Sequence, residues 1–425
     1  MDMLHHIINF FGAEWPFSPL MPGGHRESIS RPLTDSRSIS IRDRYNSPMN
    51  PPLLPAPLLI ENRESLKEMT DRLTREPLLA VDTESNSLYA YQEQVCLIQF
   101  SIPGFDYLVD PLAIRDLSSL APLFSNPKIE KVLHGAEYDV MCLARDFKFQ
   151  IVNLFDTRVA SRTLGWERTS LSDLLVQVFS VNVDKRFQRA NWGKRPLSSE
   201  MLDYARLDTH YLLKLRDHLH QLLRDNGSLE EAQELCERMA DPPLRENGFG
   251  PDGFWRIAHS RELSRRKAAI LRELYLMRDR YARRQNRPPF KILGDRSLLA
   301  IAKKEPRTTE ELHGLPGLTN NSVRRYGVEF LAAVEQGLKA PIPQKPRNRG
   351  LDEAARTRYE SLREWRKNAA KKRKLESDLI MPRDLLVEIA SRTPLNLADL
   401  RQIMDPLESR FQRYGEEILK IIHKT

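Results

Sequence analysis

The 425-residue chain is too long for one hydrophobic core, so we expect two or three domains. Apolar residues at 40% and charged residues at 29% are typical of a soluble globular protein, and no apolar run approaches the roughly 18 residues of a membrane helix. The net charge of +8 is unevenly distributed: residues 261–425 carry +15 (37 Lys and Arg, 22 Asp and Glu), and residues 1–260 carry −7 (29 Lys and Arg, 36 Asp and Glu). This asymmetry suggests that the basic part holds a polyanion and that the acidic part holds cations.

The first 57 residues lack a sustained hydrophobic period and are rich in Pro, Ser and Arg, which predicts a disordered tail or a targeting segment. The Arg and Ser residues of 28–44 are typical of a transit peptide, but Asp35 and Asp43 weaken that interpretation. A translation start at Met49 is an alternative. No secretory signal is expected, because no basic region precedes a long apolar core.

Residues 58–226 are predicted to form one α/β domain, with a mixed sheet flanked by helices. Apolar runs of strand length lie at 78–82, 95–102 and 107–109, and the turn signal Pro103-Gly104 favours an antiparallel start. Lys131–Leu133 predicts a further strand. Helices are expected at 64–76, 137–147, 155–164, 170–179 and 198–225.

Residues 227–262 are expected to be a connector, after which the sequence repeats itself with a constant offset of 88 residues. Leu274 matches Leu362, and the segment 325–331 (RYGVEFL) matches 413–419 (RYGEEIL) without a gap. Two copies of one all-α module explain this pattern. We assign them to residues 263–340 and 353–425, joined by a Pro-rich linker at 341–352.

Three segments of the first domain carry acidic residues at or near the end of an apolar element. Asp82 and Glu84 are two apart at the end of a strand, so their side chains share one face. Tyr204 and Asp208 are four apart on a helix and also share a face. Asp139 opens the helix that follows strand 131–133. We therefore expect the four carboxylates and the tyrosine to face one cleft.

Carboxylates beside a hydrophobic run are costly unless a cation neutralises them. Hard divalent cations prefer oxygen ligands, and two such ions about 4 Å apart can activate a water and stabilise the leaving oxygen of a displacement at phosphorus. Each motif alone is more often a turn, an N-cap or a surface pair. The prediction depends on all three occurring together, in this order and on these element types.

Together the segments resemble the Exo motifs of the DEDD superfamily of 3′→5′ exonucleases, in its tyrosine-bearing branch, and they are most similar to bacterial ribonuclease D. The stretch Lys185–Ser198 is similar to the segment that precedes the third motif in that family. It departs from the family at Ala190-Asn191, where Ser-Asp is usual. The resemblance covers residues 58–226 and implies an RNase H-like fold.

The resemblance implies that Asp82, Glu84, Asp139 and Asp208 hold two Mg²⁺ or Mn²⁺ ions and that Tyr204 orients the attacking water. These five residues would be the catalytic set. Contacts to the substrate strand are expected from His134, Gln99, Lys185, Gln188, Trp192 and Arg195. For His134 and Gln99, a packing role is the alternative.

The repeated module resembles the HRDC domain, a small helical bundle that binds nucleic acid. In the first copy, backbone amides near Gly314 and Gly317 are expected to hold a phosphate, whereas Asp405 disfavours this in the second copy. Basic residues on the first helix of each copy would add affinity for phosphates that does not depend on base sequence. A protein-docking bundle with solvated charges is the alternative.

The combined resemblance implies a metal-dependent 3′→5′ exoribonuclease that releases 5′-mononucleotides and trims the 3′ ends of tRNA precursors and other small structured RNAs. Two alternatives stay open: a DNA exonuclease of the repair or proofreading type, and a catalytically silent RNA-binding scaffold. We expect RNA as the partner, a monomer and no membrane association. Because Cys96, Cys142 and Cys236 lack disulfide or metal spacing, we expect free thiols and a cytoplasmic protein.

Overall fold

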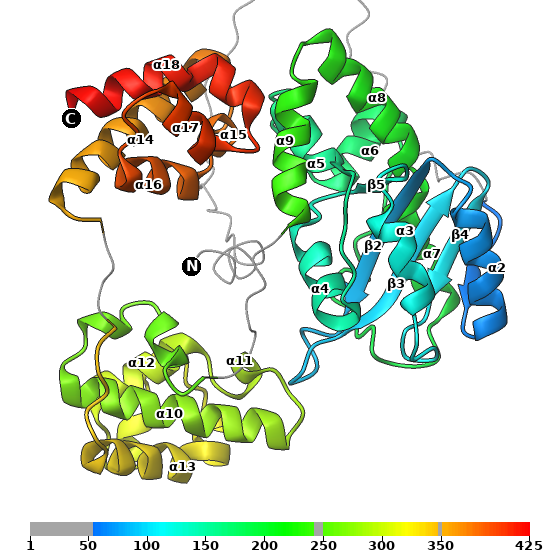
Figure 1. Cartoon of the computed structure of the whole chain (residues 1–425). Coiled ribbons are helices and arrows are strands. Elements are labelled where there is room, and N and C mark those ends of the chain that lie inside the picture. Colours follow the sequence, from blue (N-terminus) through cyan, green and yellow to red (C-terminus); the bar gives the residue numbers. More distant parts are fainter. Residues whose placement is uncertain (1–53, 242–249, 347–350) are drawn as a thin grey trace, which may run out of the picture.

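The computed structural model describes residues 54–241, 250–346 and 351–425. Figure 1 shows an α/β domain followed by two helical bundles, which confirms the predicted fold class. The tail predicted for residues 1–57 falls almost wholly outside the described residues, and so does part of the linker predicted at 341–352. Among the described residues, no helix is long and apolar enough to cross a membrane.

The sheet of the α/β domain has six strands in the order β1-β4-β3-β2-β5-β6. Their bounds are β1 (Leu58–Ile60), β2 (Leu78–Ser85), β3 (Val95–Ile102), β4 (Phe105–Val109), β5 (Glu130–Leu133) and β6 (Leu154–Asp156). Strands β2, β3 and β4 are antiparallel, as predicted, whereas β1 pairs with β4, β5 with β2, and β6 with β5 in parallel. The two edge strands, of three residues each, were not predicted.

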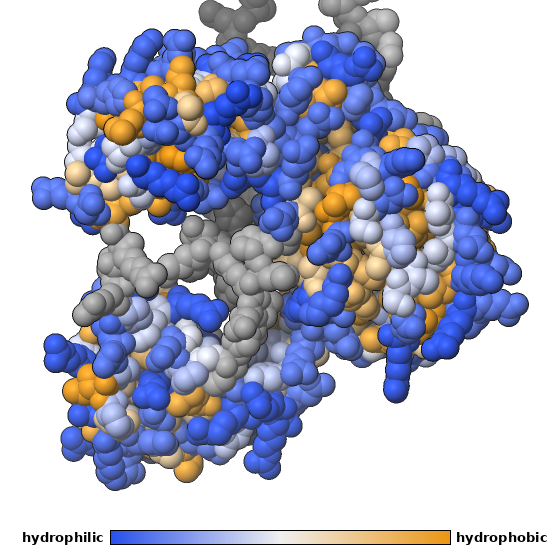
Figure 2. All heavy atoms as spheres, in the orientation of Figure 1, coloured by the Kyte–Doolittle hydropathy of each residue, from blue (hydrophilic) through white to orange (hydrophobic). Residues whose placement is uncertain are grey.

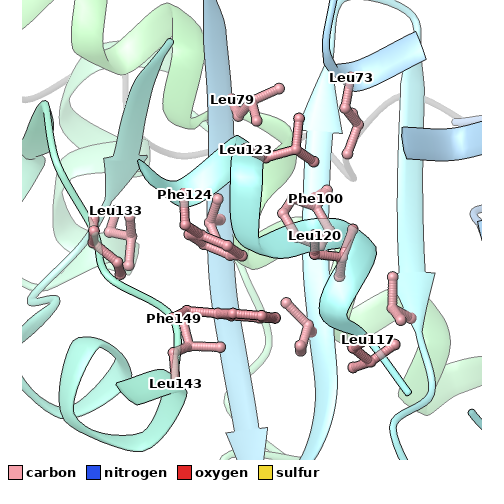
Figure 3. Packing of buried hydrophobic residues seen from close by; sticks show 14 of the residues in the cluster. Leu73, Leu79, Phe100, Leu117, Leu120, Leu123, Phe124, Leu133, Leu143 and Phe149 are labelled. Carbon is pink, nitrogen blue, oxygen red and sulfur yellow. The ribbon is translucent and has the colours of Figure 1, made fainter. Parts of the chain in front are cut away.

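Helices cover both faces of this sheet. They are α2 (Arg63–Leu73), α3 (Ala121–Ser125), α4 (Glu137–Phe147), α5 (Thr157–Thr163), α6 (Leu171–Phe179), α7 (Ser199–His210), α8 (Leu212–Asp225) and α9 (Leu229–Ala240). On one face α2, α3 and α4 build a core around Leu79, Val81 and Phe100 (Figure 3), where Phe124 and Phe149 stack at 4.8 Å. On the other face α5, α6 and α8 pack over Ala80 and Val132.

Three of the predicted helices differ from the prediction by more than one residue. The helix expected over 64–76 ends at Leu73. Phe155 belongs to strand β6, where it pairs with Val132 of β5. The Asp156 side chain accepts the backbone amides of Arg158 and Val159, so α5 begins at Thr157, two residues later than predicted. The helix expected over 198–225 breaks at Tyr211 into α7 and α8.

The expected connector at 227–262 contains structure of both neighbouring domains. Its first half forms α9, which packs against β6 and α5 and places Cys236 in the core of the α/β domain. Its second half brings Phe254 and Trp255 into the core of the first bundle. The α/β domain therefore extends to Ala240.

The two bundles repeat one architecture. The first contains α10 (Arg265–Arg284), α11 (Pro289–Ile292), α12 (Asp295–Lys304) and α13 (Asn320–Lys339), and the second contains α14 (Glu353–Arg373), α15 (Ser377–Ile380), α16 (Arg383–Arg392), α17 (Leu397–Met404) and α18 (Glu408–Lys424). Helices α14, α15, α16 and α18 begin 88 residues after α10, α11, α12 and α13. The repeated Leu274 and Leu362 are both fully buried. Figure 2 shows hydrophilic residues over most of the visible face of both bundles.

The second bundle docks on the α/β domain, where α18 contacts α9 (Figure 1). The most buried part of this contact is a group of five charged residues that we call the docking cluster: Glu231 and Glu234 of α9 with Arg373, Arg410 and Arg413 of the bundle. More exposed carboxylates of the bundle add the ion pairs of Arg162 with Glu376 and Asp378 and of Arg238 with Asp384. Arg410 is 0% exposed and donates to Glu234 Oε2 at 2.5 Å and to the Glu231 carbonyl at 2.8 Å. The second bundle is thus joined to the α/β domain by a buried ion-pair network.

Candidate active site

Strand β2 carries the first two carboxylates. Leu79 and Val81 point into the α2–α4 core, so the alternating residues Ala80, Asp82 and Glu84 point to the other face of the sheet. Asp82 and Glu84 keep partial solvent access. The β2–β3 pairing shifts by one residue between Glu84 and Ser85, so the regular ladder ends directly after this acidic pair.

Helix α7 brings Tyr204 and Asp208 to the same face. It packs across β2, β3 and β4, and the hydroxyls of Thr209 and Ser101 lie 2.7 Å apart at the contact with β3. The helix begins where the Ser198 hydroxyl accepts the Met201 amide. The charge of Asp208 acts on both Asp82 and Glu84, so its side chain lies near the acidic pair of β2.

Asp139 completes the set from the first turn of α4, where its side chain is 7% exposed. The Thr83 hydroxyl, between Asp82 and Glu84 on β2, donates a hydrogen bond to Asp139 Oδ1. This bond ties α4 to β2. Thr83 lies inside the first sequence motif, but its role depends on a contact with a residue 56 positions away, which a local pattern does not reveal.

The carboxylates raise one another's pKa values. Burial, followed by the charges of Asp139 and Asp208, raises the pKa of Asp82 well above its ordinary value, and burial with the charge of Asp208 does the same for Glu84. Burial raises the pKa of Asp139 to about 7, and burial with the Asp139 charge raises that of Asp208 to about 7. The charges acting on Asp82, Glu84 and Asp208 are those of other carboxylates, so the set lacks the compensation that a divalent cation would give.

The carboxylates do not yet form a closed cage. Among residues 54–241, 250–346 and 351–425, no three His, Cys, Asp or Glu side chains stand in an arrangement that would hold an ion. Asp139 is turned toward the Thr83 hydroxyl. The residue types and their shared location fit a divalent cation, and binding requires the side chains to turn toward it.

Tyr204 is held between two aromatic rings. The Phe187 ring meets it edge-on at 5.9 Å and the Trp192 ring lies 6.0 Å away. Burial and the charge of Asp208 raise the pKa of Tyr204 above its ordinary range, so its hydroxyl keeps its proton at neutral pH. Phe187 was missed in the sequence, although it lies in the recognised stretch 185–198.

Two of the predicted strand contacts are buried, and a third is bound to another residue of the protein. Gln99 is 0% exposed and Trp192 is 1% exposed, so neither reaches a strand in this structure. Arg195 is bound by both Asp110 oxygens and by the Cys96 carbonyl. Burial opposes the ionisation of Asp110, but the bond and charge of Arg195, together with the backbone amides of Leu112 and Ala113, outweigh it and hold the pKa of Asp110 below its ordinary value. The burial of Gln99 favours the packing alternative, and contact with a strand stays a prediction for Trp192 and Arg195.

Of the other predicted strand contacts, one is partly buried and two are exposed. His134 Nδ1 lies 2.9 Å from the Thr157 hydroxyl, and burial lowers the pKa of His134 to about 4, which favours the packing alternative. Lys185 and Gln188 are exposed, so contact with a strand stays a prediction for both.

Comparison with known proteins places this geometry in a family. Residues 57–224 match the family model described as 3′-5′ exonuclease, and residues 267–334 and 355–422 match the HRDC domain. The crystal structure of the catalytic core of RRP6 from Trypanosoma brucei is 32% identical, covers 67% of this chain and 80% of that chain, and has a TM-score of 0.58. The chain belongs to the 3′-5′ exonuclease family.

This 3′-5′ exonuclease family member is also similar to two further proteins. The Exosome complex component 10 homolog of Caenorhabditis elegans is 35% identical over 59% of this chain and 29% of its own length. The chain spans about a third of the length of such curated relatives. The crystal structure of Escherichia coli RNase D shares the fold. It is 24% identical, covers 84% of this chain and 99% of that chain, and has a TM-score of 0.62. The likeness to ribonuclease D is thus one of fold, and the family match supports the expected 3′-5′ exonuclease superfamily. The curated relatives carry names such as Protein RRP6-like 3, of Arabidopsis thaliana, and come from eukaryotes. Their description as components of a complex gives the expected monomer no support.

The raised pKa values predict that metal binding depends on pH. Ligand carboxylates must lose their protons to bind a cation, and Asp139 and Asp208 hold theirs up to about pH 7. Affinity for Mn²⁺ should therefore fall by about tenfold or more from pH 8 to pH 6. Titration of free Mn²⁺ by electron paramagnetic resonance measures this, and an affinity unchanged between the two pH values would contradict it.

Proposed function

We propose that this protein is a divalent-metal-dependent 3′→5′ exoribonuclease that releases 5′-mononucleotides. The observation that carries the proposal is the gathering of four carboxylates from three separate elements, with raised pKa values and a protonated tyrosine beside them. A cluster of this kind destabilises a fold unless it serves a bound cation, which argues against a silent scaffold.

In this proposal Asp82, Glu84, Asp139 and Asp208 hold two Mg²⁺ or Mn²⁺ ions. When bound, such ions lower the pKa of water and neutralise charge on the phosphoryl oxygens. The chain itself contributes positioning: Tyr204 keeps its hydroxyl proton and presents it as a hydrogen-bond group toward the attacking water. The Phe187 and Trp192 rings hold the tyrosine in that orientation.

RNA is the proposed substrate because the relatives are described as exosome components and as an exoribonuclease involved in structured RNA processing. Trimming of tRNA precursors remains part of the proposal. The bundles would add affinity through exposed cations such as Arg280, Arg284, Lys371 and Lys372. Other cations of the same helices serve the fold, as Arg278 does by bonding to Asp295 and the Leu293 carbonyl.

The test uses the full chain with 5′-labelled RNA that ends in a single-stranded 3′ tail. With Mg²⁺ or Mn²⁺ we expect a ladder that shortens from the 3′ end and releases 5′-mononucleotides, and chelation should stop it. Glu84→Gln should reduce the rate by about 10²-fold or more, because one ligand charge is lost. A matched DNA strand discriminates the alternative, since DNA cleaved as fast as RNA would favour a DNA exonuclease. An intact RNA strand with either metal would refute the proposal.

A further inference from the structure

The Gln99 side chain lies beside the carboxylate cluster without a partner of its own. Gln99 of β3 is the antiparallel partner of Asp82 on β2, and such opposed residues point to the same face with Cβ atoms about 5 Å apart. Two residues along the same face, Ser101 meets Thr209 of α7, the residue after Asp208. Gln99 therefore lies between the two elements that carry Asp82 and Asp208.

Both polar atoms of this side chain are buried without a hydrogen bond. Gln99 is 0% exposed, and within the part of the chain that the structure describes neither its Nε2 nor its Oε1 has a partner. A buried amide without partners costs free energy, and such groups in native proteins require an explanation. Other buried groups without partners, such as the Trp192 indole nitrogen, leave a single atom unbonded. Gln99 leaves both a donor and an acceptor.

We propose that Gln99 is a positioning residue for the metal-binding carboxylates and donates a hydrogen bond from Nε2 to the Asp82 carboxylate when that group binds a cation. This inference depends on the proposed function, because it assigns a role toward the ion that the four carboxylates would hold. A carboxylate has more lone pairs than one cation uses, and the remaining oxygen accepts a hydrogen bond from a neighbouring group.

The chemistry of the neighbourhood favours this assignment over a plain packing role. An apolar residue of similar size would fill the space between β3 and α7 without leaving an unpaired amide. Asp82, directly opposite, is a carboxylate whose neighbouring charges are those of Asp139 and Asp208. A neutral donor at this position can orient Asp82 without competing for its charge, which a Lys or Arg would do.

The test compares Mn²⁺ binding in wild-type protein with binding in Gln99→Leu and Gln99→Met, two variants of similar volume without hydrogen bonds. Mn²⁺ alone is the probe, followed by electron paramagnetic resonance at pH 8, together with thermal unfolding with and without Mn²⁺. We expect the dissociation constant to rise about 10- to 100-fold in both variants. The metal-free melting temperature should stay equal or rise, because an unpaired amide is replaced by an apolar group.

Thr163→Val is the matched control. The Thr163 hydroxyl is also buried without a partner, but it lies at the end of α5, a helix that carries none of the four carboxylates. This variant should keep the wild-type affinity for Mn²⁺. The inference is overturned if both Gln99 variants fold and bind Mn²⁺ as wild type does, or if Thr163→Val weakens binding equally. Failure of wild-type protein to bind Mn²⁺ would instead refute the proposed function, so the two failures are distinguishable.

Discussion

Asp208→Asn is expected to lower the rate of RNA hydrolysis by at least about 10³-fold and, in the same protein, to raise the metal-free melting temperature at pH 8. The rate falls because one ligand charge is lost from the site, and 10³-fold corresponds to about 4 kcal/mol at the barrier. Stability rises because the substitution removes a carboxylate that burial and Asp139 disfavour in its ionised form.

The stability gain has a defined dependence on pH. The folded-state pKa of Asp208 is about 7, above its ordinary value of 3.8, so the folded protein holds this proton more tightly than the unfolded chain does. The stabilisation from protonated Asp208 is fully present below about pH 4 and is lost as the pH rises through about 7. The gain from Asp208→Asn should therefore be large at pH 8 and small at pH 5, as thermal unfolding at the two pH values measures.

Asp203→Asn provides the control on the same helix, because the Asp203 side chain is 57% exposed and its buried partner Arg206 also donates to the Pro55 carbonyl. It should change neither the rate nor the pH dependence of unfolding. Mn²⁺ should raise the melting temperature of this control as it does for wild type, and by much less for Asp208→Asn. A stability loss at pH 8 in Asp208→Asn, or a wild-type rate, would contradict the assignment of Asp208.

The sequence predicted those features of the site that depend on the period of a single element. Asp82 and Glu84 share a face because strand side chains alternate, and Tyr204 and Asp208 share one because a helix turns in 3.6 residues. The pairing of β2 with β3 and the packing of α7 then bring the two pairs together. The sharing of a face within each pair follows from the sequence alone.

Features that depend on distant partners were missed or misassigned. The sequence indicates that Arg195 is a cation available to a strand, because its partner Asp110 lies 85 residues away in the chain and cannot be recognised locally. Gln99 reads as a polar residue available to a strand, but α7 covers it. Strands β1 and β6 are too short to show a period, and sheet pairing rather than their own sequence defines them.

The docking cluster was also missed, although the repeat carried a signal for it. Arg410 and Arg373 of the second bundle correspond, at the offset of 88, to Ser322 and Gln285 of the first. Charged residues in one copy and neutral residues in the other indicate that the copies differ in their surroundings. The structure gives the reason, because these arginines reach Glu231 and Glu234 on α9. The protein-docking alternative therefore describes part of the surface of the second bundle.

Arg410→Met is expected to release the second bundle from the α/β domain and to lower its melting temperature by at least about 10 °C. Removing one partner of a buried ion pair costs about 3–5 kcal/mol, because the other charge stays buried and uncompensated. Arg410 also donates twice to the Leu379 carbonyl of α15, at 2.9 and 3.2 Å, so α15 loses this donor as well. Scanning calorimetry should resolve an early transition for this bundle.

Two further variants separate the buried pair from a general effect of charge. Arg401→Met removes an exposed pair with Glu408 in the same bundle, which should shift the melting temperature by less than about 5 °C. Arg410→Met combined with Glu234→Leu removes both buried charges, so part of the lost stability should return, because an apolar pair replaces an uncompensated carboxylate. Equal effects of Arg410→Met and Arg401→Met, or a double variant less stable than Arg410→Met, would show that this ion pair does not hold the bundle in place.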